Sequence, residues 1–571
     1  MRSNIAFRTR LIGVFFIGIA VLLVARLYVL QIARGEAYRR SATAQYVEQS
    51  PDTLNRGNIY FTTKDGALVA AAVMQSGYRI AITPGDIADP ERAYESMNAI
   101  TKIDRERYDT SIKRVDDPYE EIAFRVSDDA AKKIRALKIK GVLLVQDQWR
   151  TYPGGHLAAQ AVGFVGFKGD KRVGVYGLER QFESTLIETT TGLYVNPFAE
   201  IFANVGALLS RDTEGRQGDI ITSIEPAAQA ELEKVLDGVM STYSPKIAGG
   251  IVMDPRTGEI RALGMRPGFD PNSYNTVDDP SVFGNPLVEG RYELGSIMKP
   301  ITVAVGIDSG AITPATTYYD AGCIERSTKT ICNYDRKARH TVPMQEVLNQ
   351  SLNLGVTFIT DKMTHPVFTD YMRAFGFGSK TGIDLPNEVT GDISTLGEGR
   401  SPDVNYAAAS FGQGVSVSPI AMTRALSALA NGGMLPNPHV VTAVRYESGI
   451  TREIAASSSI QVLKSETART VSEMLTTVFD EALLNGKYKM EHYSIAAKTG
   501  TAQIAVPGRG YYEDRFLHSF FGYFPAQDPK LIVFLFTVEP HGAEFASATL
   551  AQPFDDLAKF LINYYDIPPD R

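Results

Sequence analysis

The sequence predicts an α+β protein in which an antiparallel sheet has helices before, between and after its strands. Residues 249–264, GGIVMDPRTGEIRALG, predict a hairpin that turns at DPRTG. Three more strand patterns cover 494–504, 518–524 and 530–538, the last two separated by an Asp-Pro turn. The amphipathic pattern FDDLAKFLINYY at 554–565 then predicts a helix. The chain therefore joins a C-terminal sheet to flanking helices.

Length and charge narrow the class of protein. At 571 residues the chain is long enough for two or more domains, each with its own core. The net charge is −7 with acids and bases well mixed, so we expect no nucleic-acid partner. The seven histidines show no metal-ligand spacing, and we expect neither a metal nor a cofactor.

The N-terminus predicts a membrane anchor. A basic stretch at 1–10 precedes unbroken apolar sequence at 11–25, and LYVL continues the run after Arg26. Together these give about 20 residues, enough for one membrane helix over 11–31 if Arg26 snorkels. The alternative is a cleaved signal peptide, but its A-x-A-like site at 41–44 lies far beyond the apolar run. We expect an uncleaved anchor with residues 1–10 in the cytoplasm.

The chain has only two cysteines, Cys323 and Cys332, in CIERSTKTIC. Their spacing suits a short hairpin closed by a disulfide, which needs an oxidising compartment. Two free buried thiols are the alternative.

Arginines flank both sides of the apolar run, so charge alone does not orient the anchor.

The stretch YELGSIMKP at 292–300 combines a hydroxyl, an amine and a helix-breaker. Proline is tolerated only in the first helical turn, so Pro300 predicts a helix that begins near Ser296. Ser296 and Lys299 then share one face at i and i+3. A serine, a nearby base and helix N-terminal N–H groups are the parts of a nucleophilic site.

Two further motifs follow in order. In EVLNQSLNLGV, Ser351 and Asn353 lie near an end or bend of a helix. In the strand SIAAKTGTAQI, small residues surround 498–501, Lys498-Thr499-Gly500-Thr501, where a ligand backbone could approach closely.

Together, the three motifs resemble the S-x-x-K, S-D-N and K-T-G set of the penicillin-recognising serine enzymes. The whole chain closely resembles class B penicillin-binding proteins, most of all the division-specific, FtsI-like branch. Family-like segments occur at 56–70, 151–166, 174–186, 410–419 and 429–433. Within the first, Tyr60-Phe61-Thr62 departs from the family's RG-x-I-x-D-R-x-G pattern, which leaves the local role of this segment open.

The resemblance implies a fold and a set of domains. We expect a penicillin-binding transpeptidase or serine β-lactamase-like fold, with an elongated N-terminal pedestal of the dimerisation type and one transmembrane helix. The pedestal is expected over 32–225 and the transpeptidase domain over 226–571. The protein is then expected in the bacterial cell (inner) membrane, single-pass, with its catalytic domain on the periplasmic or extracellular side.

The resemblance also implies the chemistry. Ser296 would attack the penultimate D-Ala carbonyl of a stem peptide, with Lys299, unprotonated among positive charges, as its base. Backbone N–H groups of Ser296 and Thr501 would form the oxyanion hole. Ser351 and Asn353 would relay protons to the leaving amine and hold the substrate amide.

Further residues would bind the donor peptide. Lys498, Thr499 and Thr501, with Gly500 between them, would bind the terminal carboxylate. Gln413 and Gly414 would form the cleft wall or serve a purely structural loop. The acyl-enzyme would then be resolved by the amine of a second stem peptide, and β-lactams would be trapped at the same serine.

Several alternatives stay open. A β-lactamase or β-lactam sensor shares the fold, but EVLN at 346–349 precedes Ser351 and so sits in the wrong place for the lactamase E-x-x-L-N motif. An inactive scaffold has no reason to keep all three motifs. An elongation enzyme is the alternative to septal synthesis.

The resemblance implies a SEDS-type glycosyltransferase and other divisome proteins as partners, which would contact the anchor and pedestal.

Overall fold

The computed structural model describes residues 55–571 except 170, 188–216, 328, 398–401, 455–458, 507 and 509, and before them only Gly18 and Arg26. The expected anchor at 11–31 therefore lies outside the described residues, apart from those two helical positions. Among the residues that are described, no helix is long and apolar enough to cross a membrane.

The chain forms two compact units, one made chiefly of 76–148 and one of 56–75, 149–187 and 217–571. In the first unit, the later part of β2 pairs antiparallel with β3, and β4 pairs with β2. The helices α3, α4 and α5 each begin at a capping side chain, from Asp89, Asp104 or Ser127, which accepts a hydrogen bond from a backbone N–H three residues later. The elements are β2 (Leu68–Ile82), η2 (Pro84–Asp86), α3 (Pro90–Asn98), α4 (Arg105–Ser111), β3 (Glu120–Val126), α5 (Asp128–Ala136) and β4 (Val142–Thr151).

The second unit begins with a small sheet that joins distant parts of the chain. Its strands follow the order β16-β15-β7-β1, and the first part of β2 pairs with β1. Strands from 441–453 thus complete a sheet started by residues 59–62. The elements are β1 (Ile59–Thr62), α6 (Ala159–Val162), β5 (Val165–Lys168), β6 (Lys171–Gly174), α7 (Gly177–Gln181), α8 (Glu183–Leu186), β7 (Gly218–Thr222), β15 (Val441–Tyr446) and β16 (Thr451–Glu453).

A buried ion cluster lies beside this small sheet. The Glu179 carboxylate accepts hydrogen bonds from Arg56 Nε at 2.5 Å and from Arg150 Nε at 2.6 Å. Arg56 also pairs with Glu183 at 2.7 Å. The RGNI segment, whose local role the sequence left open, thus meets the later GLER segment through paired charges.

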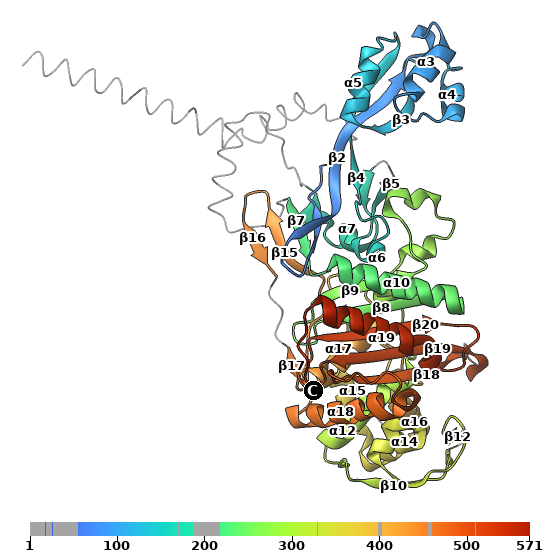
Figure 1. The fold of residues 1–571 in the computed structure, drawn as a ribbon, viewed down its shortest axis with the longest axis vertical. Helices are drawn as coiled ribbons and strands as arrows, with labels where there is room; N and C mark the ends of the chain where they lie inside the picture. The colour runs from blue at the N-terminus through green and yellow to red at the C-terminus, as the bar shows by residue number, and fades with distance from the viewer. Residues whose placement is uncertain are drawn as a thin grey trace, which may run out of the picture. The chain divides into compact units, whose positions relative to one another are not determined.

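A five-stranded antiparallel sheet in the order β18-β19-β20-β8-β9 forms the centre of the second unit (Figure 1). Side chains alternate between its faces, as at Phe520 and Phe521, which enter different core clusters. Helices α10 and α19 cover one face, while α12, α17 and α18 contribute to the core on the other. The elements are α10 (Pro226–Tyr243), β8 (Ile247–Met253), β9 (Ile260–Arg266), β18 (Ala496–Val506), β19 (Gly510–Phe524), β20 (Leu531–Val538) and α19 (Ala546–Tyr564).

The mixed α+β architecture predicted from the sequence is confirmed, with two differences in extent. Strand β19 begins at Gly510, well before the expected 518, because its first half pairs with the end of β18. Helix α19 begins at Ala546 and contains Pro553, whereas the amphipathic pattern was apparent only after that proline. Local periodicity underestimates an element where tertiary pairing extends it.

The remaining elements of the described chain belong to the second unit. They are η3 (Pro271–Thr276), η4 (Pro280–Phe283), α11 (Pro286–Glu289), η5 (Gly295–Met298), α12 (Lys299–Asp308), β10 (Thr317–Asp320), β11 (Cys323–Arg326), β12 (Lys329–Cys332), β13 (His340–Pro343), α13 (Met344–Asn349), α14 (Asn353–Lys362), α15 (His365–Ala374), η6 (Ser394–Leu396), α16 (Asp403–Ser410), α17 (Pro419–Ala430), β14 (Met434–Leu435), β17 (Ile460–Gln461), α18 (Ser465–Thr477), η7 (Val478–Ala482) and η8 (Leu483–Gly486).

Candidate active site

Ser296 lies in a short 3-10 turn, η5, that runs directly into α12. Pro300 occupies the first turn of α12, where no intrahelical donor is lost, as the sequence indicated. Gly295 has a positive φ of 65°, and a Cβ there would come within 2.8 Å of the Thr501 carbonyl oxygen. The nucleophile turn therefore fits against β18 only because this residue is glycine.

Gly500, on β18, allows the same close approach between this strand and the nucleophile turn. A Cβ at Gly500 would lie 2.7 Å from the Leu294 carbonyl oxygen, which already accepts a hydrogen bond from the Ser519 hydroxyl at 2.9 Å. Small residues in the K-T-G strand were expected to admit a ligand backbone. At Gly500 the close neighbours are instead the Ser519 hydroxyl and the backbone of the nucleophile turn.

Lys299 begins α12 with its side chain buried. Its Nζ donates to the Ser351 carbonyl oxygen at 2.6 Å and to Ser351 Oγ at 3.1 Å. Burial, and secondarily the charge of Lys498, hold the pKa of Lys299 well below its ordinary value. The sequence had attributed a neutral Lys299 to neighbouring positive charge, but burial has the larger effect.

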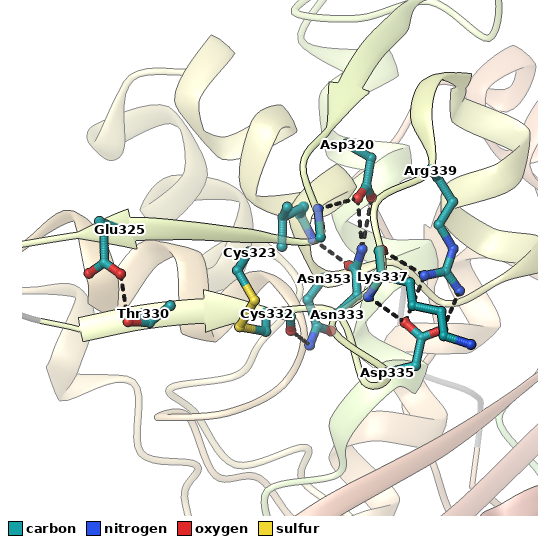
Figure 2. The surroundings of a disulfide bond; sticks show 12 residues. Asp320, Cys323, Glu325, Thr330, Cys332, Asn333, Asp335, Lys337, Arg339 and Asn353 are labelled. Atoms are coloured by element: carbon teal, nitrogen blue, oxygen red, sulfur yellow. Dashed lines mark hydrogen bonds and ion pairs between the residues drawn. A yellow bond between two sulfur atoms is a disulfide. The ribbon is translucent and has the colours of Figure 1, made fainter.

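Ser351 and Asn353 occupy the junction between α13 and α14. Ser351 adopts a φ of 55°, a left-handed conformation that costs a non-glycine residue about 1–2 kcal/mol. Such a turn ends one helix and starts the next, so both side chains reach the space in front of Lys299. Asn353 Nδ2 also donates to the Cys332 carbonyl oxygen at 2.8 Å (Figure 2).

The K-T-G motif lies on β18, where side chains alternate between faces. Thr499 and Thr501 are half-buried and line the cleft, and Thr501 Oγ1 accepts a hydrogen bond from Ala546 N at 3.1 Å. Lys498 and Gly500 are buried and do not line it. Burial lowers the pKa of Lys498 to about 8.

These residues surround one cleft of about 910 Å³. Eight of the ten residues that the sequence singled out line it: Ser296, Lys299, Ser351, Asn353, Gln413, Gly414, Thr499 and Thr501. The volume falls within the usual range for small-molecule sites. The structure therefore brings together three motifs that are separated by some two hundred residues of sequence.

Sequence reasoning missed other residues of the cleft wall. Tyr334 and Phe545 both line it, with ring centroids 5.8 Å apart. Glu293 does not line the cleft itself; it lies next to the nucleophile turn and accepts a hydrogen bond at 2.9 Å from Oη of Tyr511, which does line it, and burial raises the pKa of Glu293. The two rings come from segments without periodicity, so no sequence signal placed them; Glu293 was quoted in the nucleophile motif without a role.

The Cys323–Cys332 disulfide expected from the spacing is present, and it closes the β11–β12 hairpin (Figure 2). Cys332 itself lines the cleft. The hairpin is thus part of the candidate site, through the hydrogen bond that its carbonyl accepts from Asn353.

Comparison with known proteins gives two family matches. Residues 248–559 match the family described as penicillin binding protein transpeptidase domain. Residues 51–195 match the penicillin-binding protein dimerisation domain. Together the two matches cover most of the chain.

Individual relatives agree with these matches. Stage V sporulation protein D of Bacillus subtilis is 30% identical over 565 residues, covering 96% of this chain and 85% of the relative. A peptidoglycan D,D-transpeptidase FtsI of Buchnera aphidicola is 24% identical, covering 79% and 76%. The crystal structure of penicillin binding protein 3 from Mycobacterium tuberculosis in complex with aztreonam is 25% identical with a TM-score of 0.65, covering 75% of this chain and 92% of that one.

Proposed function

Because this chain belongs to the family of penicillin-binding protein transpeptidases, we propose that Ser296 is its acyl-enzyme nucleophile. The protein is a class B enzyme, a peptidoglycan D,D-transpeptidase with an N-terminal dimerisation domain. The observation that supports the assignment of Ser296 is its place in a cleft with Lys299, a buried amine whose pKa is strongly lowered.

In the first step, Ser296 Oγ attacks the carbonyl carbon of the penultimate D-Ala, and its proton passes to the neutral Nζ of Lys299. A tetrahedral oxyanion forms, and backbone N–H groups of Ser296 and Thr501 stabilise it. The C–N bond to the terminal D-Ala then breaks, and this D-Ala leaves as a free amino acid after its nitrogen takes up a proton.

That proton reaches the leaving nitrogen through Ser351, whose hydroxyl already lies 3.1 Å from Lys299 Nζ. The amide of Asn353 holds the substrate amide. In the second half-reaction, the amine of another stem peptide attacks the acyl-enzyme and gives the cross-link. That amine loses a proton through Ser351 to Lys299, which was left neutral by the first step, and Lys299 passes it to Ser296 Oγ as the ester bond breaks.

The terminal carboxylate of the donor binds to the hydroxyls of Thr499 and Thr501. Because Thr501 Oγ1 accepts from Ala546 N, its own proton is free to point to an anion. Lys498, behind these residues, supplies positive charge while it is protonated. We place Gln413 and Gly414 in the wall of the same cleft.

The cellular setting is a further part of the proposal. We place the enzyme in septal wall synthesis rather than elongation, anchored by residues 11–31 in the cell membrane with its pedestal at 32–225 and transpeptidase domain at 226–571 on the outer side. A SEDS-type glycosyltransferase and divisome proteins are its partners. Paired pedestal and transpeptidase matches support this setting over a β-lactamase, for which a pedestal has no use.

Intact-mass spectrometry of the full-length protein with benzylpenicillin tests the proposal. We expect a persistent adduct of one drug molecule on the wild type and none on Ser296→Ala. An adduct that disappears within seconds would assign the protein to the β-lactamases. A folded wild type that forms no adduct would favour an inactive scaffold.

A further inference from the structure

The amide of Asn353 is oriented by a different part of the chain. Its Nδ2 donates to the carbonyl oxygen of Cys332 at 2.8 Å, at the end of the disulfide hairpin (Figure 2). This bond uses one of the two Nδ2 hydrogens and fixes the direction of the amide, which leaves Oδ1 and the second Nδ2 hydrogen for the N–H and C=O of a substrate amide. The direction of the Asn353 amide therefore depends on where the Cys332 carbonyl lies.

Asn333, the next residue, is buried and uses both ends of its side chain. Its Nδ2 donates to both carboxylate oxygens of Asp320 at 2.9 Å, and its Oδ1 accepts from Leu354 N at 3.3 Å. Its backbone N–H donates to the Gly322 carbonyl oxygen at 2.9 Å. The residue is thus held on one side by Asp320 and on the other by the start of α14.

The second contact replaces a missing helix cap. A helix normally begins with Ser, Thr, Asp or Asn, whose side chain accepts from the first free N–H groups. Helix α14 has Leu352 in that position, with no side-chain cap, because the motif places Ser351 and Asn353 on either side of it. Asn333 supplies the missing acceptor from a separate segment of the chain.

The Asp320 carboxylate anchors the side chain of Asn333. The carboxylate is fully buried and accepts from Tyr318 Oη at 2.7 Å and from Gly322 N at 2.8 Å, as well as from Asn333. Neutral donors hold it, and no described cation lies within ion-pair distance. A buried charge keeps its place only with such complete hydrogen bonding, so movement of Asn333 away from it is strongly disfavoured.

We propose that Asn333 is a positioning residue for Asn353. Anchored on the Asp320 carboxylate, it caps α14 and holds the adjacent Cys332 carbonyl in the place from which the Asn353 amide is oriented. The inference rests on the proposed function, since it assigns Asn353 the role of holding the substrate amide. A residue that only stabilised the hairpin would change unfolding without changing how an amide-bearing ligand reacts.

The test measures acylation of the full-length protein by two β-lactams at several concentrations. Benzylpenicillin carries a side-chain amide whose carbonyl oxygen would accept from Asn353 Nδ2, whereas 6-aminopenicillanic acid has a free amine and no carbonyl in its place. We expect Asn333→Ala to slow acylation by benzylpenicillin by about tenfold, as loss of a buried hydrogen-bond network implies, and that by 6-aminopenicillanic acid by about twofold or less.

A double-mutant cycle identifies the residue through which Asn333 acts. In an Asn353→Ala background, Asn333→Ala should slow acylation by no more than about twofold, because its effect passes through the missing amide. Asp335→Asn is the matched control: it breaks the ion pair with Arg339 in the same loop, which has no bond to Asn353, and should leave both rates unchanged.

Equal slowing with both drugs, or additive effects in the cycle, would overturn the proposal. So would an Asn333→Ala protein that loses thermal stability but is acylated at the wild-type rate. If Asn333→Ala does not fold, Asp320→Asn, which keeps the shape of the anchor and removes its charge, takes its place with the same expectations. A wild type without an adduct at Ser296 would instead reject the proposed function itself.

Discussion

Two regions of the molecule bury charged side chains, and they do so in opposite ways. Beside the small sheet, Arg56, Arg150 and Glu179 are buried together, and the cations lie against the carboxylate. At the candidate site, Lys299, which lines the cleft, and Lys498, which does not, are 1% and 3% exposed, with no described carboxylate in ion-pair contact. The same burial therefore has different chemical consequences.

The pKa values follow from the presence or absence of a counter-ion. Burial alone would raise the pKa of Glu179, but the charges of Arg150 and Arg56 outweigh it and lower the pKa. Without a carboxylate partner, burial lowers the pKa of both lysines. Paired charges stay ionised and inert, whereas the unpaired Lys299, whose pKa is lowered the further of the two lysines, becomes a neutral base.

The largest effect expected from this contrast is at Lys299. Lys299→Met removes the base and fills its site with a side chain of similar length, so acylation should fall by about a thousandfold or more while thermal stability is kept. Stopped-flow acylation and thermal unfolding measure the two effects. Lys299→Arg, which buries a permanent cation, should lose both acylation activity and thermal stability. A Met variant that is acylated within tenfold of wild type would break the contrast.

Loss of a charge from the ion cluster should lower stability and leave acylation unchanged, the opposite of the result expected at Lys299. Glu179→Gln leaves Arg150 buried without its counter-ion, and we expect a loss of about 3–5 kcal/mol in the free energy of unfolding with normal acylation of the folded protein. Denaturant unfolding measures the loss. Glu183→Gln, at a side chain 31% exposed, is the matched control and should cost about 1 kcal/mol. Equal costs at the two positions would show that burial of the pair is unimportant.

Loss of the charge on Lys498 should weaken ligand binding at alkaline pH. Since its pKa is about 8, it is charged at neutral pH and loses its charge above that value. The dissociation constant of the complex that precedes acylation should then rise by about tenfold for each pH unit above 8, up to the limit set by charge alone. Lys498→Arg should move this rise to higher pH, because guanidinium stays charged. An unchanged profile would remove Lys498 from carboxylate binding.

The smallest effect on stability is expected where a buried hydrogen bond joins two neutral side chains. The hydroxyls of Ser472 and Tyr523 lie 2.7 Å apart, and neither is charged. Tyr523→Phe should cost only about 1 kcal/mol in unfolding free energy and leave acylation unchanged, as loss of one neutral hydrogen bond predicts. A cost as large as that of Glu179→Gln would mean that charge is not what separates the two regions.

How much the sequence predicted depends on whether a feature is local. Ser296 and Lys299 are three residues apart, so helix geometry alone places them together, and Pro300 marks where that helix begins. The cysteine spacing likewise predicted the hairpin, since pairing of Cys323 with Cys332 is set within one short segment.

The features that were not predicted arise from contacts between distant segments. No periodicity marks Asn333 as the cap of α14, and charged residues are expected at the surface, so the burial of Glu179 had no signal in the sequence. The sheet that joins 59–62 to 441–453 was also missed, because parallel and long-range pairing leaves only short strand patterns.

The most direct measurement is the pH dependence of the acylation rate constant of wild-type protein at saturating benzylpenicillin. Because burial without a counter-ion lowers the pKa of Lys299 well below its ordinary value, we expect a neutral Lys299 and a rate constant that does not rise between about pH 8 and about pH 10. A lysine with an ordinary pKa would instead gain about tenfold in rate for each pH unit over that interval. Such a rise would contradict the claim that burial without a counter-ion makes Lys299 the base.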